Sequence, residues 1–221
     1  MLAVYAVVFG VIFGAHAPGE TPTDYVLQLF LGISLFQLLA ETMVVAPTVI
    51  VGSPNLVKKV VFPLELLPLS QLGATWFHFL ISLCLLLVGI VIFGHGLTVR
   101  GLLWLPPILA PLLLLSIGLC WICAALGVFF RDLAQAMPFL TQVVFYSSAV
   151  LYRTAIITPR LWAVLKWNPF LRTVNLARSA LLWNAPVNLN QLGYTYVFGL
   201  AVFFLGRLIF LKLQPAFADV I

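Results

Sequence analysis

Charged residues are scarce in this chain, and their scarcity excludes most soluble folds. Only 8% of the 221 residues are charged, 63% are hydrophobic, and the mean hydropathy is +1.16. Soluble domains carry roughly 25% charged residues. The composition therefore predicts an integral membrane protein with no room for a nucleotide-binding domain, and we expect no nucleic acid partner.

Acidic, histidine and cysteine residues are too few and too scattered to predict a catalytic or metal site. The six acids lie at positions 20, 24, 41, 65, 132 and 219, and the three histidines lie at 16, 78 and 95. No nucleophile can be assembled with a base and an orienting acid. The cysteines lie in apolar runs, so Cys120-x-x-Cys123 is interpreted as packing rather than as a redox or metal pair. We predict no catalytic residue, metal or cofactor on this chain.

Long uncharged runs make up most of what is present. A spanning helix needs about 20 apolar residues, and lipid leaves an open backbone without partners, which favours helices. Pro106, Pro107 and Pro111 lie near the start of the fourth run, where they predict kinks or a late helix start. We predict a single all-α membrane domain over 1–221 with six transmembrane helices, at about 1–14, 25–51, 64–93, 102–130, 134–151 and 194–211.

The first run, residues 1–14, is shorter than a membrane span. Its residues reach about 21 Å as a helix, against a hydrocarbon core of roughly 30 Å. One alternative is a signal peptide cleaved after "AHA" at 15–17, but no positive residue precedes the apolar run. We expect instead a truncated first span that upstream residues would complete.

A polar stretch, "SPNLVKKVVFPLELLPL", separates the second run from the third. Asn55 can cap a short helix and Pro63 can end it. The pattern predicts a helix at 55–62 that lies at the membrane surface with Lys58 and Lys59 on its solvated side. An ordinary positively charged loop is the alternative interpretation.

Glu41 is the acid that lies clearly within a long run, about eleven residues or roughly 16 Å from Gly52. A charge in the hydrocarbon core costs a few kcal/mol, so Glu41 should face the bundle interior or a wet cavity. Two interpretations stay open, namely a structural hydrogen bond to a neighbouring helix and a direct role in transport.

The segment 152–190 is too polar for a simple span, yet it is rich in tryptophan. Thr158-Pro159 and Asn168-Pro169 each offer a cap followed by proline at the first helical position, which predicts two short helices at about 159–183. The second helix is amphipathic and should lie along the outer interface or dip back into the bundle. Its apolar stripe is Phe170, Val174, Ala177 and Leu181, opposite Arg172, Asn175 and Ser179.

Several of these pieces, taken in order, resemble one protein family. "NLVKKVVFPLELLPL" resembles the loop after the second span in ABC-2 type permeases that export O-antigen, capsule or teichoic acid chains. "VYAVVFGVIFG", "ALGVFFRDLAQ" and "WNPFLRTVNLARSALL" are similar to the family's first span, the turn between spans four and five, and the segment before the last span. Around "SSAVLYRTAIITP" the family commonly has a serine-proline pair and a further proline, where this chain has Ala149 and Arg153.

The resemblance implies a transport subunit without enzymatic activity. Such a chain forms a homodimeric channel in the bacterial inner membrane, binds a separate ABC-type ATPase that holds ATP and Mg, and passes a lipid-linked polysaccharide among membrane lipids. Counting Lys and Arg does not fix the orientation, so the cytoplasmic position of the 55–62 helix is taken from the family. An ABC-2 exporter of a drug or small lipid is the near alternative, and an ion-coupled secondary transporter is a distant one.

The resemblance also implies two groups of functional residues. The ATPase-coupling group comprises Asn55, Leu56, Val57, Lys58, Lys59, Val60, Phe62, Pro63, Glu65, Arg131 and Asp132. The translocation path or gate comprises Glu41, Phe145, Tyr152, Trp162, Asn168, Pro169, Arg172 and Arg178, where basic residues would attract anionic headgroups or a pyrophosphate-linked glycan. Two alternatives remain: a local salt bridge for Arg131 and Asp132, and binding of anionic lipid by Lys58 and Lys59.

Overall fold

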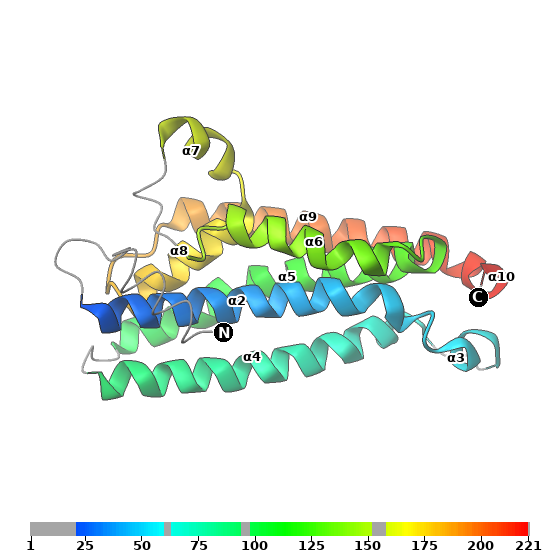
Figure 1. Ribbon diagram of the computed structural model, residues 1–221, viewed down its shortest axis with the longest axis horizontal. Helices are drawn as coiled ribbons and strands as arrows, with labels where there is room; N and C mark the ends of the chain where they lie inside the picture. The colour runs from blue at the N-terminus through cyan, green and yellow to red at the C-terminus, as the bar shows by residue number, and fades with distance from the viewer. Residues whose placement is uncertain (1–20, 60–62, 94–97, 152–157, 221) are drawn as a thin grey trace. The chain divides into compact units, whose positions relative to one another are not determined.

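The computed structural model describes residues 21–59, 63–93, 98–151 and 158–220, and every regular element within them is a helix (Figure 1). The all-α prediction is therefore confirmed for these ranges, whereas the predicted first span at 1–14 lies outside them. The elements are α2 (Pro22–Val49), α3 (Pro54–Lys59), α4 (Leu66–Ile92), α5 (Val99–Phe129), α6 (Leu133–Ser147), α7 (Pro159–Leu165), α8 (Pro169–Leu181), α9 (Leu189–Leu213), η3 (Gln214–Ala216) and α10 (Phe217–Val220).

Within the described residues, four helices are long and apolar enough to cross a membrane. They are α2, α4, α5 and the stretch Leu189–Ala216 formed by α9 and η3, with 28, 27, 31 and 28 residues. Each exceeds the roughly 20 residues that a span requires. α6 has only 15 residues and is about 22 Å long. The chain is therefore a multi-pass membrane protein in which α6 is shorter than a span.

α5 contradicts the expectation of a late helix start. It begins at Val99 and continues through Pro106, Pro107 and Pro111 without interruption. Proline removes a backbone donor from the helix. In lipid, however, an unwound segment would leave several more backbone groups without partners, so the helix is retained.

Contacts between residues divide the chain into two compact units, and each long helix contributes to both. The first unit comprises Met1–Gln37, Phe79–Ala110 and Val144–Thr195. Most of α8 is buried there. Phe36 stacks on Phe145 at 4.7 Å between ring centroids and lies 6.4 Å from Phe170. α8 therefore dips back into the bundle, which was one of the two expected placements.

The second unit comprises Leu38–His78, Pro111–Val143 and Tyr196–Ile221. Its core contains Cys120 and Cys123, both buried, as expected of packing residues. α5 and α9 approach closely in this unit, because a Cβ added at Gly206 would meet the backbone of Gly118, and one at Gly118 would meet Val202. Small residues permit such backbone contact between membrane helices.

Candidate functional site

The short helix predicted between the second and third spans is present as α3, but its bounds differ. α3 runs from Pro54 to Lys59, and the backbone N–H groups of Leu56 and Val57 donate to the carbonyl of Ser53 at 3.1 and 3.4 Å. Ser53, rather than Asn55, therefore takes the position before the helix, and Pro54 takes the first helical position that proline favours.

Only part of the predicted coupling group lies within the structure. Lys58 and Lys59 belong to α3, but their side chains are outside what the structure describes, as are Val60 and Phe62 altogether. Asn55 and Pro63 are exposed, and the side chains of Leu56 and Val57 are half-buried. The described part of the helix thus keeps some apolar surface against the protein and some polar surface away from it.

The residues after α3 are fastened to α5. The indole Nε1 of Trp121 donates to the carbonyl of Glu65 at 3.2 Å, and the Cys120 thiol donates to the carbonyl of Pro68 at 3.3 Å. Leu64 is buried in the core of the second unit. These contacts fix the start of α4 against α5.

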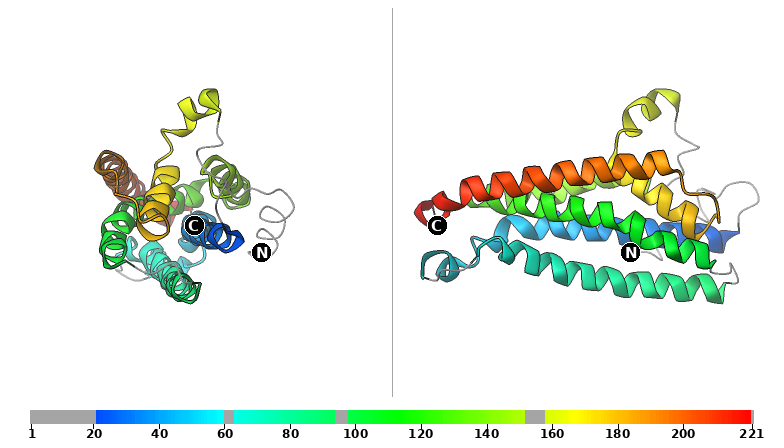
Figure 2. Two further views of the ribbon diagram at one scale, coloured as in Figure 1. Left: turned by 90° about the vertical axis from the view of Figure 1, so that its left-hand side faces the viewer. Right: turned by 180° about the vertical axis from the view of Figure 1, so that it is seen from behind.

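A contact that the sequence did not suggest joins α3 to α10, near the right-hand edge of Figure 1 and the left-hand edge of the right panel in Figure 2. α10 begins at Phe217, which is fully buried and stacks on Phe129 and Phe210 at 6.0 and 5.5 Å between ring centroids. Its signal in the sequence is an aromatic residue spaced one helical repeat beyond Phe210. The segment after α9 therefore supports α3.

Arg131 and Asp132 lie in the turn that precedes α6, and both are exposed. The carbonyl of Asp132 accepts from the N–H groups of Gln135 and Ala136 at 3.1 Å each, which opens the first turn of α6. Arg131 lines a hollow of about 340 Å³ together with Pro47, Thr48, Val51, Gly52, Gly127 and Ala134. The structure thus brings Arg131 to the end of α2 that leads into α3.

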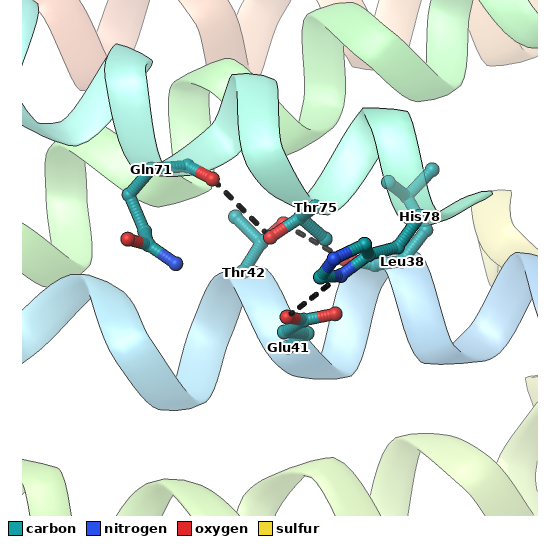
Figure 3. Close-up of polar contacts among 6 residues, drawn as sticks. All are labelled: Leu38, Glu41, Thr42, Gln71, Thr75 and His78. Carbon is teal, nitrogen blue, oxygen red and sulfur yellow. Dashed lines mark hydrogen bonds and ion pairs between the residues drawn. The ribbon is translucent and has the colours of Figure 1, made fainter. Parts of the chain in front are cut away.

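Glu41 on α2 faces His78 on α4, with 3.8 Å between Oε1 and Nδ1 (Figure 3). Beside them, the hydroxyls of Thr42 and Thr75 donate to carbonyls of their own helices, those of Leu38 at 2.7 Å and Gln71 at 3.3 Å. The side chain of His78 is 66% exposed and that of Glu41 is 27% exposed. Glu41 therefore does contact a neighbouring helix, through a partner that sequence reasoning had set aside as an isolated histidine.

The depth of this pair in the membrane makes its exposure significant. His78 lies one residue before the midpoint of α4, and Glu41 lies eight residues before the end of α2, or about 12 Å. A charged side chain facing hydrocarbon at such a depth costs about 3 kcal/mol on insertion scales. Counting along the sequence from the loop at 53–63 places both residues well inside their helices, but it does not by itself pair them.

Arg178 on α8 is only 2% exposed and binds backbone carbonyls of the first unit. Its Nη1 donates to Ala149 at 3.0 Å, and its Nη2 donates to Val150 at 2.7 Å and to Gln28 at 3.4 Å. Gly32 leaves room for this group, because a Cβ there would come within 3.0 Å of Nη2. Arg178, which was predicted as a gate residue, thus joins α8 to α2 and to the residues after α6 by buried hydrogen bonds.

Two of the three carbonyls that Arg178 binds, those of Ala149 and Val150, lie just after the end of α6. Ala149 has φ of 51°, which is the left-handed region that few residues other than glycine adopt. The next carbonyl, that of Leu151, accepts from the hydroxyl of Tyr25 at 3.0 Å. Irregular backbone at membrane depth needs such partners, and a cation near a helix C-terminus also matches the helix dipole. Ala149, where this chain departs from the family pattern, therefore lies in backbone that hydrogen bonds from Arg178 and Tyr25 hold in place.

Asn168 caps α8 as predicted. Its Oδ1 accepts from the N–H groups of Phe170 and Leu171 at 2.9 and 3.3 Å, and Pro169 follows at the first helical position. Its Nδ2 donates to the carbonyl of Ser147 at 3.2 Å and to Oγ of Ser148 at 3.0 Å. One amide thus joins the start of α8 to the end of α6.

Replacing Asn168 by alanine is expected to destabilise the protein by about 2 kcal/mol, since a lost cap costs about 1 kcal/mol and the bonds to Ser147 and Ser148 add a similar amount. The midpoint of thermal unfolding in detergent should fall by roughly 4–8 °C. Thr158→Ala is the matched control, because Thr158 precedes α7 without a side-chain cap bond. Equal shifts for the two variants would contradict the capping role.

The remaining predicted gate residues differ in how exposed their side chains are. Phe145 is only 6% exposed and packs against Phe36. Trp162 on α7 is exposed. The guanidinium of Arg172 lies 4.0 Å from the ring centroid of Tyr194, and its Nε donates to the carbonyl of Lys166 at 2.7 Å. Tyr152 lies outside the described residues.

Comparison with known proteins identifies the family. The model of the family described as "ABC-2 type transporter" matches residues 1–182, which is most of the chain. The chain belongs to the ABC-2 type transporter family. The resemblance noted in the sequence is thereby confirmed at the family level, and α3 and the Arg131–Asp132 turn of this ABC-2 protein both lie within the matched range.

Named relatives of this ABC-2 protein come from three bacteria. The chain is 25% identical over 218 residues to the O-antigen export system permease protein RfbA of Klebsiella pneumoniae, covering 99% of this chain and 83% of that protein. It is 27% identical over 151 residues to RfbA of Myxococcus xanthus, covering 68% and 56%. It is 26% identical over 105 residues to the polysialic acid transport protein KpsM of Escherichia coli, covering 48% and 41%.

Proposed function

We propose that this chain is the channel-forming permease subunit of an ATP-driven exporter that moves a lipid-linked polysaccharide across the bacterial inner membrane. The observation that carries the proposal is the family match over residues 1–182, joined to named export permeases that align with nearly the whole chain. The described helices fit a transport subunit, because four of them are long enough to span a membrane.

The assembly that we propose has two copies of this chain and a separate ATPase that holds ATP and Mg. Each copy would cross the membrane six times, with the run at 1–14 and α6 as the additional spans. α6 is too short to span alone, but its end is buried against Arg178 and Asn168 rather than facing lipid. The remainder of the crossing would be made by irregular backbone that the protein shields.

Coupling to the ATPase would pass through α3. Closure of the ATPase dimer would displace α3, and the bonds from Trp121 and Cys120 to the start of α4 would carry that displacement into the membrane. Arg131, exposed beside the hollow at the end of α2, is placed to make a second contact. Trp162, which is exposed, would belong to the outer rim of the path together with the half-buried Arg172 and with Pro169 at the start of α8.

Reversing Lys58 and Lys59 to glutamate in the assembled transporter is the test of this proposal. Two lost attractions and two new repulsions amount to about 2 kcal/mol or more, so ATPase binding should weaken roughly thirtyfold. The measurements are co-purification of an ABC-type ATPase that is produced together with this chain in the host, and the amount of surface polysaccharide. Lys212→Glu, which reverses an exposed cation at the end of α9, is the control and should leave both unchanged.

Two results would contradict the proposal in different ways. If no ATPase co-purifies with the unchanged chain, an ATP-driven mechanism is wrong. If the ATPase binds but deletion of the gene leaves surface polysaccharide intact, the cargo is wrong and an ABC-2 exporter of a drug or small lipid takes its place.

A further inference from the structure

Glu41 and His78 face each other without forming a hydrogen bond. At 3.8 Å, Oε1 and Nδ1 are beyond hydrogen-bond distance. An ionised carboxylate has about four acceptor sites. Among the described residues, the Glu41 side chain makes one polar contact, the ion pair with His78. Glu41 therefore keeps most of its capacity to accept hydrogen bonds.

The neighbouring polar groups do not use that capacity. The hydroxyls of Thr42 and Thr75 are buried and donate to carbonyls of their own helices, as Figure 3 shows. Phe77, next to His78 in the chain, presents an exposed ring. An accepting carboxylate and an imidazole thus face each other between α2 and α4 in the second unit.

We infer that Glu41 and His78 form a binding site for sugar hydroxyl groups in the wall of the translocation path, about halfway across the membrane. This inference rests on the proposed function. Sugar hydroxyls are donors as well as acceptors, so they suit a carboxylate and an imidazole. A carboxylate in a low-dielectric passage repels anions. The site therefore takes uncharged, hydroxyl-rich sugar rather than acidic sugar.

Water access to His78 is the first test, made on the assembled transporter in membrane vesicles. In a Cys84→Ala background, which removes the exposed native thiol, His78→Cys should react about tenfold faster than Leu80→Cys with a positively charged, membrane-impermeant methanethiosulfonate. Leu80 is also exposed on α4 but lies about 200° round the helix from His78. Glu41→Cys gives a second position should His78→Cys fail to fold. Equal, slow reaction at all three positions would overturn the inference.

Export is the second test, with the host's own surface polysaccharide as the probe. Glu41→Leu should lower the amount of surface polysaccharide at least about fivefold, with the quantity of folded permease unchanged. Glu41→Gln keeps an acceptor, so its surface polysaccharide should stay within about twofold of that of the unchanged chain. If the unchanged chain restores no polysaccharide to a deletion strain, the proposed function fails. If the unchanged chain and Glu41→Leu both restore it fully, only the sugar site is wrong.

Discussion

Replacement of Arg178 by methionine is expected to remove most of the folded protein from the membrane. The substitution leaves the carbonyls of Gln28, Ala149 and Val150 without their donor in the interior of the first unit. Each unsatisfied buried group costs about 1–3 kcal/mol, so the three together cost roughly 3–9 kcal/mol, which is a large part of a typical stability of about 5–15 kcal/mol. The measurement is the yield of monodisperse protein and its unfolding midpoint, which should fall by roughly 10 °C.

Two comparisons separate this effect from a simple loss of charge. Arg172→Met removes an arginine from the same helix, but its stacking on Tyr194 is partly exposed and is worth about 1 kcal/mol. Arg178→Lys keeps the charge but lacks the planar fork that reaches several carbonyls, so it should fall between the other two. A stable Arg178→Met protein would show that the carbonyls find other donors.

Substitution of Gly206 by alanine should produce the second large effect. The new Cβ would meet the backbone of Gly118, and a backbone cannot move aside as a flexible side chain can. Separating α9 from α5 would also loosen the stacking of Trp121 on Phe203, whose ring centroids lie 5.3 Å apart. We expect a loss of about 3 kcal/mol, seen as a fall of roughly 6–12 °C in the unfolding midpoint.

Gly73→Ala is the matched control for this substitution. Gly73 lies within α4, and a Cβ there would meet nothing within 4 Å. Because alanine is the better helix former, this change should be neutral or should stabilise the protein by up to about 1 kcal/mol. The difference between the two variants therefore measures the close approach of α5 and α9. A similar midpoint for both would contradict that packing.

The sequence predicted the long helices well, because lipid permits few alternatives to a continuous helix. It was less successful with α5, where prolines that would break a soluble helix do not prevent a helix from starting at Val99. The expected span at 134–151 corresponds to a helix that ends at Ser147. Its end depends on Arg178 and Asn168, which come from a later segment, and a local pattern of hydrophobicity does not contain such distant partners.

The candidate sites show the same division between local and distant information. Asn168 and Pro169 were found because a cap and the proline after it are neighbours in the chain. His78 was missed because its partner Glu41 lies on another helix. The burial of Phe145 depends on Phe36 from α2, which no count along the sequence from residue 145 would indicate.

The buried ring of Phe217 has a consequence for how this protein opens. Since that ring packs against Phe129 and Phe210, we expect the backbone at Phe217 to enter a protease only after the aromatic cluster separates. Cleavage within residues 214–220 then reports local unfolding of the second unit, at a rate set by the population of the open form. Limited proteolysis would thus detect loosening of the contact between α10 and α3 before the long helices separate.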